Sequence, residues 1–422
     1  MSQTSAPSST KQKVYPWLVV LAWAFMGTAA MQVVMVGMGQ YFKPISDALG
    51  QPISQLAFML SFGPLVLSFC APIIGRLYLK LDSRVLLTLM GVMVFGAYAS
   101  MAFFTELWMW LPASIILGAG MAGIGTIGAP IFITNWFKKR AGFALGLYSI
   151  LIAGLTMIIS PLIALVIKTF GYQTSLLIWA GICCVMYFPW VFFVLRFKPE
   201  EIGLKPYGYV EGEVEEGERV ISADKGVPFK KALPTATFVF LVIALVIMFN
   251  HSGWMSNMSQ IVQAGWGYDI IFGGLVMSFY TGAQFTAPVV GWLIDRIGAI
   301  KTVVITLALV CVGFVALWLL HDITFAVLFG AFCIGYSSVN MKMVIPLVVR
   351  DLFGQKDHTK IYSFVFGIGQ FLGTWSVTLV ALIGEVAGSY DVTMVIGFIV
   401  TAVALCSILL ASATSKKLVW ES

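Results

Sequence analysis

Charge is scarce in this sequence of 422 residues: Asp, Glu, Lys and Arg together make up 10% of it, against 59% hydrophobic residues. A soluble chain of this length needs a far more polar surface, so lipid must be the solvent for most of its side chains. The six cysteines all fall inside apolar runs, and none has metal-ligand spacing with a His or another Cys pair. We therefore expect no disulfide framework, no metal site and no cofactor.

Catalytic patterns are missing as well. The sequence contains no paired carboxylates, no Ser-His-Asp set and no phosphate-binding glycine loop, and its one long polar segment is a linker. These absences argue against an enzyme or a receptor. Residues 1–13 are polar, lack a cleavage site suited to a signal peptide and lead straight into a full-length apolar run, so we expect a cytoplasmic tail.

The basic residues are distributed unevenly along the chain. If the N-terminus is cytoplasmic, all 25 Lys and Arg residues lie on the cytoplasmic side except Lys43, Lys168 and Lys342. This asymmetry follows the positive-inside rule and predicts that both termini are cytoplasmic. The net charge of +6 then reflects membrane topology and not a nucleic acid partner.

Twelve apolar segments are long enough to span a bilayer, which needs about 20 residues each. In the first half they are residues 15–41, 54–79, 84–104, 107–136, 142–167 and 174–196. In the second half they are residues 234–258, 269–294, 300–320, 324–349, 359–384 and 391–413. The sequence thus predicts an all-α polytopic membrane protein with a tail (1–14), a six-helix bundle (15–197), a cytoplasmic linker (198–233), a second bundle (234–413) and a C-terminal tail (414–422).

A short repeat relates the two halves. Ala71-Pro72-Ile73-Ile74-Gly75-Arg76-Leu77 matches Ala287-Pro288-Val289-Val290-Gly291-Trp292-Leu293 at an offset of 216 positions, and Trp136-Phe137 falls on Leu352-Phe353 at the same offset. A repeat at about half the chain length inside apolar sequence indicates two pseudo-symmetric bundles.

The second copy continues as Ile294-Asp295-Arg296-Ile297-Gly298, which resembles the G-x-L-a-D-R-x-G signature of major facilitator superfamily transporters. The resemblance implies the major facilitator fold of twelve helices and transport by alternating access. It implies gating roles for Gly75, Arg76, Gly291, Asp295 and Arg296. Asp295 can pair with cations or cap the next helix. The first copy departs from the signature, with Leu79 where Asp is expected and Asp82 where Gly is expected.

Three further stretches narrow the resemblance. Residues 135–146, 196–208 and 351–354 are similar to the loops of oxalate/formate antiporters and monocarboxylate porters. Members of that branch typically bind carboxylates with an Arg in helix eight and often a Lys in helix eleven. Here residues 271–284 contain no cation and helix eleven has only Lys360, at its cytoplasmic end, so those roles cannot be transferred and a dicarboxylate is less expected.

Lys342 is the only Lys, Arg, Asp or Glu that we place inside a span and away from its ends. By helical rise it lies about 12 Å from the cytoplasmic end at Arg350 and about 26 Å from the outer end. A charge there costs at least ~2.5 kcal/mol on insertion scales, which points to a functional site. Pro346 also removes the amide that would bond the Lys342 carbonyl. We predict that Lys342 binds an anionic substrate; the alternative is a lysine that reaches the cytoplasmic interface along its stem.

Other polar residues inside the spans are candidates for the same site. His251 could carry a proton or donate to a carboxylate, or it could stand in water at the outer end of its helix. Tyr280 and Gln284 are four residues apart and should share a helix face. Each such group could instead form an interhelical hydrogen bond. The full set of predicted substrate-binding residues is Lys342, His251, Asn250, Gln32, Tyr280, Gln284, Asn340 and Gln370.

No carboxylate is expected inside the membrane, because all 19 acidic residues fall in predicted loops or tails, with Asp269 at the outer edge of helix eight. This favours exchange or facilitated diffusion, unless His251 or Asp269 relays protons. We expect a monomeric carrier of a small organic anion, such as a monocarboxylate, in the bacterial inner membrane, with protons or a counter-transported anion as its coupling partners. The alternative is an exporter of larger apolar or aromatic solutes, although residues 154–161 lack the G-P-x-x-G-G pattern of proton-driven drug antiporters.

Overall fold

The computed structural model describes residues 10–78, 80–137, 140–209, 226–354, 356–416 and 418. These ranges form helices and contain no β-strand element. The helices of the first half are α1 (Thr10–Gly27), η1 (Thr28–Val36), α2 (Met38–Leu49), α3 (Ile53–Leu77), α4 (Ser83–Ser100), η2 (Met101–Phe103), η3 (Leu107–Met109), α5 (Trp110–Ala122), η4 (Gly123–Gly128), α6 (Ala129–Trp136), α7 (Ala141–Pro189), η5 (Trp190–Val194) and η6 (Pro199–Ile202).

The second half is equally helical. Its helices are α8 (Phe229–Ala232), α9 (Ala236–Gln260), η7 (Ile261–Gly265), α10 (Ile270–Gly282), η8 (Ala283–Thr286), α11 (Ala287–Ile297), α12 (Ala299–Leu319), α13 (Thr324–Val339), η9 (Asn340–Val344), α14 (Ile345–Phe353), α15 (His358–Gly373), α16 (Ser376–Ala387) and α17 (Asp391–Ser415). Among these short η segments, η1, η4, η5, η7 and η9 are π-helical and the others are 3-10 helices.

Ten helical stretches in the described part are long and apolar enough to cross a membrane. One of them, Phe143–Val194, has 52 residues, which correspond to about 78 Å of helix against a hydrocarbon core of about 30 Å. Gly171 interrupts it with φ 79° and ψ 166°, so this stretch consists of two spans. With the span formed by α13, η9 and α14, all twelve predicted spans are present as helical segments.

The structure confirms the internal repeat. α4 begins at Ser83 and α12 at Ala299, which again is an offset of 216 positions. The same offset relates α6 to α14, and each of these two helices follows a π-helical segment and has a proline as its second residue. Because proline lacks an N–H group, the carbonyl one turn earlier loses its α-helical bond, and the wider turn lies where that bond is missing.

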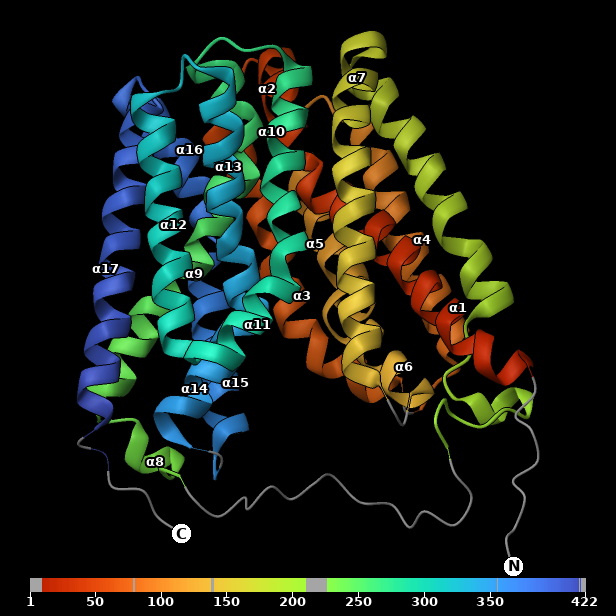
Figure 1. The fold of residues 1–422 in the computed structure, drawn as a ribbon. Helices are drawn as coiled ribbons and strands as arrows, with labels where there is room; N and C mark the ends of the chain where they lie inside the picture. Colours follow the sequence, from red (N-terminus) through yellow and green to blue (C-terminus); the bar gives the residue numbers. More distant parts are fainter. Residues whose placement is uncertain are drawn as a thin grey trace, which may run out of the picture. The chain divides into compact units, whose positions relative to one another are not determined.

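The chain forms two compact units. Unit 1 comprises the described residues of Met1–Gly37, Phe62–Thr156 and Gln173–Val220, and unit 2 comprises those of Met38–Ser61, Met157–Tyr172 and Ile221–Ser422. Unit 2 therefore contains two segments from the first half of the sequence. One of them includes α2, which packs against α9 and α10 (Figure 1).

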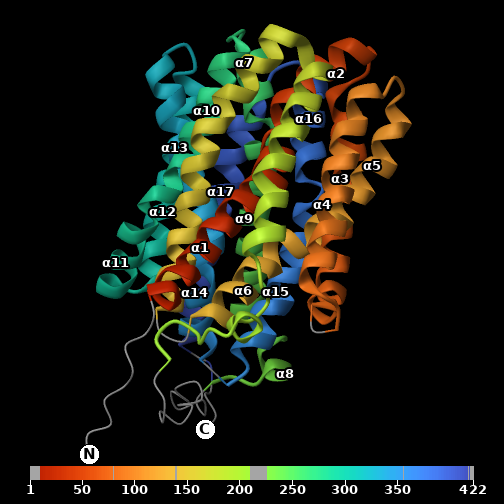
Figure 2. The ribbon, with the colours of Figure 1, turned by 90° about the vertical axis from the view of Figure 1, so that its right-hand side faces the viewer.

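Close approach of helices holds unit 2 together. α12 and α13 lie side by side in both views of the ribbon (Figures 1 and 2), and Gly313 and Gly330 meet across their interface. A Cβ on Gly313 would lie 2.7 Å from the Gly330 carbonyl oxygen, so a side chain there would force the helices apart. Small residues at such contacts are typical of helix packing in membranes, where van der Waals contact replaces the hydrophobic driving force.

Candidate functional site

The backbone of Lys342 lies in η9, the π-helical turn between α13 and α14. Its side chain lies outside the described part of the structure. The position of this turn agrees with the expectation that Pro346 opens the helix at Lys342. π-helical turns are frequent at functional sites, because they place extra backbone carbonyls and side chains on one side of a helix.

Asn340, in the same turn, is completely buried. Its Oδ1 accepts a hydrogen bond of 2.7 Å from the Thr306 hydroxyl of α12, and its Nδ2 has no partner among the described residues. Asn340 thus ties η9 to α12 inside unit 2. A solute could reach it only if these helices separated.

Tyr280 and Gln284 do not lie on one regular α-helix as expected. α10 ends at Gly282, and Gln284 lies in the 3-10 helix η8, where it is half-buried. Tyr280 is 1% exposed, and its hydroxyl lies 3.1 Å from the Ser338 hydroxyl of α13. For Tyr280 the structure therefore shows the interhelical hydrogen bond that we considered as the alternative to a substrate contact.

His251 is buried, so the expectation that it could stand in water at the outer end of its helix is wrong. Its Nε2 lies 2.9 Å from the hydroxyl of Thr401 on α17, and that hydroxyl donates to the Gly397 carbonyl. The hydroxyl proton is thereby used, so Nε2 must donate, and Nδ1 has no partner among the described residues. The imidazole ring packs near Trp254 and Phe314.

The remaining predicted substrate residues are half-buried. Asn250 donates to the Val246 carbonyl of its own helix at 2.7 Å. Gln370 lies in α15, and its carbonyl accepts from Thr374. Gln32 lies in η1 of unit 1, where its carbonyl accepts from the Gly37 amide. Apart from Gln32, the predicted set belongs to unit 2, where it is distributed over several helices.

A second cluster of polar contacts was not expected from the sequence. It joins the first-half segments of unit 2 to its second-half helices, and we call its hydrogen bonds and its ion pair the cross-half contacts. Gln40 donates to the hydroxyl of Ser160 at 2.9 Å, and that hydroxyl donates to the Gly274 carbonyl of α10 at 3.1 Å. Lys168 forms an ion pair of 2.8 Å with Asp269. The hydrogen bond from Lys168 lowers the pKa of the Asp269 carboxyl below its ordinary value.

Another cross-half contact involves a carboxylate. Glu385 accepts hydrogen bonds from the amide and the hydroxyl of Ser54 at the start of α3. We expected every acidic residue to lie in a loop or tail, but Glu385 lies inside α16, which continues to Ala387. The predicted span ends at residue 384, directly before Glu385 and three residues before the end of α16, and the position of a polar residue at a span boundary is the one signal in the sequence for this contact.

Backbone also meets backbone in this region. A Cβ placed on Gly39 of α2 would overlap the carbonyl oxygen of Ser256 on α9. Glycine is therefore required for α2 to lie this close to α9. Ser54, Asp269 and Glu385 all lie at helix ends, and α2, α10 and α16 reach the same end of unit 2 (Figure 1).

The two copies of the predicted gating loop differ in structure. In the second copy α12 follows Gly298, whose φ of 89° favours glycine, and no side chain caps the helix. Asp295 is exposed within α11, so the expectation that it could cap the next helix is wrong. The guanidinium of Arg296 lies 5.1 Å from the centre of the Trp292 ring. Gly291 is half-buried in α11.

In the first copy the displaced carboxylate is the cap. Asp82 accepts a hydrogen bond of 2.8 Å from the Arg84 amide and begins α4. Gly75 is half-buried and Arg76 exposed near the end of α3, and Leu79 lies outside the described residues. The loop that lost the signature aspartate has thus gained a helix cap.

Known proteins similar to this chain are membrane transporters. The family model described as Major Facilitator Superfamily matches residues 17–376. The Uncharacterized MFS-type transporter YhjX of Escherichia coli (strain K12) is 24% identical over 337 residues, which cover 77% of this chain and 79% of that protein.

Solved structures show the same fold at low identity. A bacterial homolog of the human lysosomal transporter Spinster, in an inward-facing and unoccupied conformation, has a TM-score of 0.71 at 14% identity and covers 97% of this chain and 99% of its own. A mutant of the nucleoside transporter NupG has a TM-score of 0.70 at 10% identity and covers 94% of this chain and 99% of its own. These matches confirm the predicted fold.

Proposed function

Because the chain belongs to the major facilitator superfamily, we propose that this multi-pass membrane transporter moves a small organic anion, most simply a monocarboxylate, by alternating access. The similarity of residues 135–146, 196–208 and 351–354 to loops of the oxalate/formate and monocarboxylate branch supports this substrate class. The proposed location is the bacterial inner membrane, with both termini in the cytoplasm.

Lys342 is the residue on which the proposal depends. An ammonium group inside a span is costly unless it has a partner, and an anionic substrate is the partner that a carrier can supply. The π-helical turn at Lys342 supports this role, because it separates α13 from α14 at that depth. The low-dielectric surroundings strengthen the attraction between the ammonium and an anion.

The cross-half contacts support alternating access. They join first-half segments to second-half helices through a few hydrogen bonds and one exposed ion pair, which rearrange more easily than a packed apolar core. We infer that residues 15–197 and 234–413 move as two bundles, and that these contacts form and break as one side of the membrane closes and opens.

Exchange is the transport mode that we favour over proton coupling. A free carrier with an uncompensated Lys342 charge should reorient slowly, and a bound anion would remove that obstacle. A counter-transported anion then serves as the coupling partner.

Uptake into proteoliposomes tests the proposal. The purified chain is assayed with a panel of radiolabelled monocarboxylates, dicarboxylates and neutral analogues, in parallel with Lys342→Gln. Lys301→Gln is the matched control, because it removes an exposed cation at the start of α12. We expect Lys342→Gln to reduce uptake of a transported monocarboxylate by about thirtyfold, equivalent to about 2 kcal/mol, while the control remains at the wild-type rate.

Uptake of a neutral aromatic solute by wild type and Lys342→Gln alike, with no carboxylate transported, would contradict the anion proposal. In that case the chain would be an exporter of larger apolar solutes, and Lys342 would be an interfacial anchor.

A further inference from the structure

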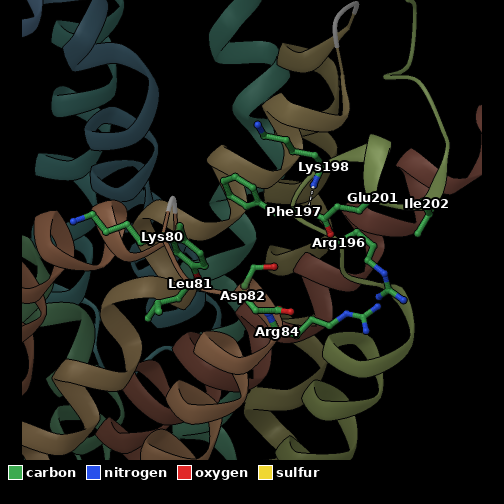
Figure 3. Close-up of a pocket in the computed structure, with 11 residues that line it drawn as sticks. Lys80, Leu81, Asp82, Arg84, Arg196, Phe197, Lys198, Glu201 and Ile202 are labelled. Carbon is green, nitrogen blue, oxygen red and sulfur yellow. Dashed lines mark hydrogen bonds between the residues drawn. The ribbon is translucent and has the colours of Figure 1, made fainter.

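Unit 1 contains a polar cavity of about 650 Å³ at the start of α4. Its wall is formed by the α3–α4 connection and by the segment that follows η5 (Figure 3). The ionisable residues in the wall are Lys80, Asp82, Arg84, Arg196, Lys198 and Glu201. Four cations therefore face two carboxylates around one cavity.

Arg84 and Arg196 are held together by a shared acceptor. Arg84 Nε donates to the Leu195 carbonyl at 3.2 Å, and Arg196 Nη1 donates to the same oxygen at 2.7 Å. Leu195 directly follows η5, so its carbonyl is one of those that a helix leaves unbonded at its end. Figure 3 shows both guanidinium groups on the same side of the cavity, whereas the ammonium groups of Lys80 and Lys198 point elsewhere.

The two carboxylates of the cavity do not neutralise this arginine pair. Asp82 accepts from the Arg84 backbone amide and Glu201 accepts from the Lys198 backbone amide. In the described part of the chain, no carboxylate oxygen lies within 4.0 Å of either guanidinium group. Arg84 Nη2 is moreover buried without a hydrogen-bond partner there. A guanidinium has five N–H donors, so each arginine retains donors after it has bonded Leu195.

The surface beside the cavity is apolar. Val85 and Leu89, one turn apart on α4, are 67% and 57% exposed, and Phe192 and Phe193 of η5 are 48% and 78% exposed. The cavity thus lies where an apolar, lipid-facing surface meets polar loops. Basic pockets in this position suit lipid head groups, whose acyl chains extend along the neighbouring helices.

We propose that Arg84 and Arg196 bind the phosphate group of an anionic phospholipid in this cavity. Two planar guanidinium groups can each give paired hydrogen bonds to a phosphate, and the anion removes the repulsion between them. The buried Arg84 Nη2 supplies one of these donors, and the acyl chains cover the exposed apolar residues of α4 and η5. The bound lipid links the start of α4 to the segment leading into the linker.

Native mass spectrometry of the full chain in detergent tests this proposal. The protein is titrated with phosphatidylglycerol, phosphatidylcholine or inorganic phosphate. The variants are Arg84→Gln with Arg196→Gln, Arg196→Gln alone, and a charge-matched control with Lys301→Gln and Lys416→Gln, which are exposed cations outside the cavity. The single variant Arg196→Gln keeps the hydrogen bond from Arg84 to Leu195, which should preserve the local fold. It therefore tests the proposal even if the double variant does not fold.

We expect wild type and control to bind phosphatidylglycerol more tightly than phosphatidylcholine. At about 1 kcal/mol per arginine, the affinity for phosphatidylglycerol should fall about fivefold in Arg196→Gln and about thirtyfold in the double variant. Unchanged affinity in a folded Arg196→Gln protein would overturn the proposal. Submillimolar displacement of phosphatidylglycerol by inorganic phosphate would also overturn it, and would assign the site to a soluble phosphate compound.

Discussion

The carboxylate of Glu385 accepts a hydrogen bond of 2.8 Å from the backbone amide of Ser54, the second residue of α3. The Ser54 hydroxyl donates to the same carboxylate. The first amides of a helix have no partner within it, and its N-terminus attracts negative charge. A residue from the second half of the chain therefore caps a helix of the first half, and this cap exists only while the two segments are in contact.

Loss of this cap should loosen the start of α3. In Glu385→Ala, we expect amide hydrogen exchange in residues 53–60 to accelerate about tenfold or more, because a hydrogen bond to a charged group contributes about 1.5–3 kcal/mol. Glu385→Gln retains one acceptor and should show a smaller effect. Glu106→Ala removes an exposed acid elsewhere and is the matched control. Equal exchange in wild type and Glu385→Ala would show that the contact does not stabilise this end.

The Lys168–Asp269 ion pair predicts a pH dependence. Its hydrogen bond lowers the Asp269 pKa in the folded state, so the unfolded state binds this proton more readily. The stabilisation is present above the ordinary pKa of about 3.9 and disappears as the pH falls through the lower folded value. Asp269→Asn should therefore melt at a lower temperature than wild type at pH 7, and the two should converge as the pH falls through the lowered folded pKa. A melting difference that persists undiminished at pH 3 would assign the effect to the asparagine itself.

The two gating loops should respond differently to substitution. Asp295→Asn should slow transport about tenfold, a coupling of about 1.4 kcal/mol, with substrate affinity unchanged, because an exposed residue near the end of α11 biases conformations without touching the ligand. Asp82→Ala should instead lower the free energy of unfolding by about 1 kcal/mol through loss of the α4 cap. Transport rates, substrate binding and chemical denaturation measured on both variants separate these roles. Lost binding with an unchanged transport rate in Asp295→Asn would contradict the gating role.

Lys342→Arg should retain partial transport. It keeps the positive charge but replaces a compact ammonium with a planar guanidinium. The same charge predicts that exchange is faster than net efflux, since under the proposed mechanism the unloaded carrier reorients without an anion on the lysine. Counterflow and efflux measured in the same proteoliposomes test this, and equal rates for the two would contradict it.

The positive-inside pattern predicts that residues 198–231 face the cytoplasm. Protease added to sealed inside-out vesicles should therefore cut in this segment, whereas right-side-out vesicles should be protected. Cutting with the opposite preference would overturn the orientation of the whole chain.

The architecture could be predicted because long apolar runs have few alternatives in a bilayer. Every backbone polar group must be bonded within the membrane, so an apolar run of about 20 residues becomes a helix whatever its neighbours are. The offset of 216 positions then predicted the correspondence of the halves, which the starts of α4 and α12 confirm. Pro346 likewise marked the irregular turn at Lys342 correctly.

The contacts of individual polar residues could not be predicted in this way. His251 meets Thr401 across 150 positions and Ser54 meets Glu385 across 331, and no local pattern indicates such partners. The sequence shows only that Asp82 stands where the signature has Gly. Its role as a helix cap depends on where α4 begins, which the sequence does not indicate. The end of a helix can be assigned only to within one or two residues, and Glu385 lies one residue beyond the predicted end of its span.

The contact between Gly39 and Ser256 has a consequence for the response of the protein to ionic strength. Backbone atoms in van der Waals contact present no net charge for ions to screen, whereas both members of the exposed Lys168–Asp269 pair, 51% and 52% exposed, interact with salt. At 1 M salt the Debye length falls to about 3 Å, which weakens the ion pair and leaves the approach of α2 to α9 unaffected. High salt therefore weakens the exposed ion pair and leaves the backbone contact between α2 and α9 intact. As a consequence, salt should change how readily these helices begin to separate more than how closely they pack when they are together.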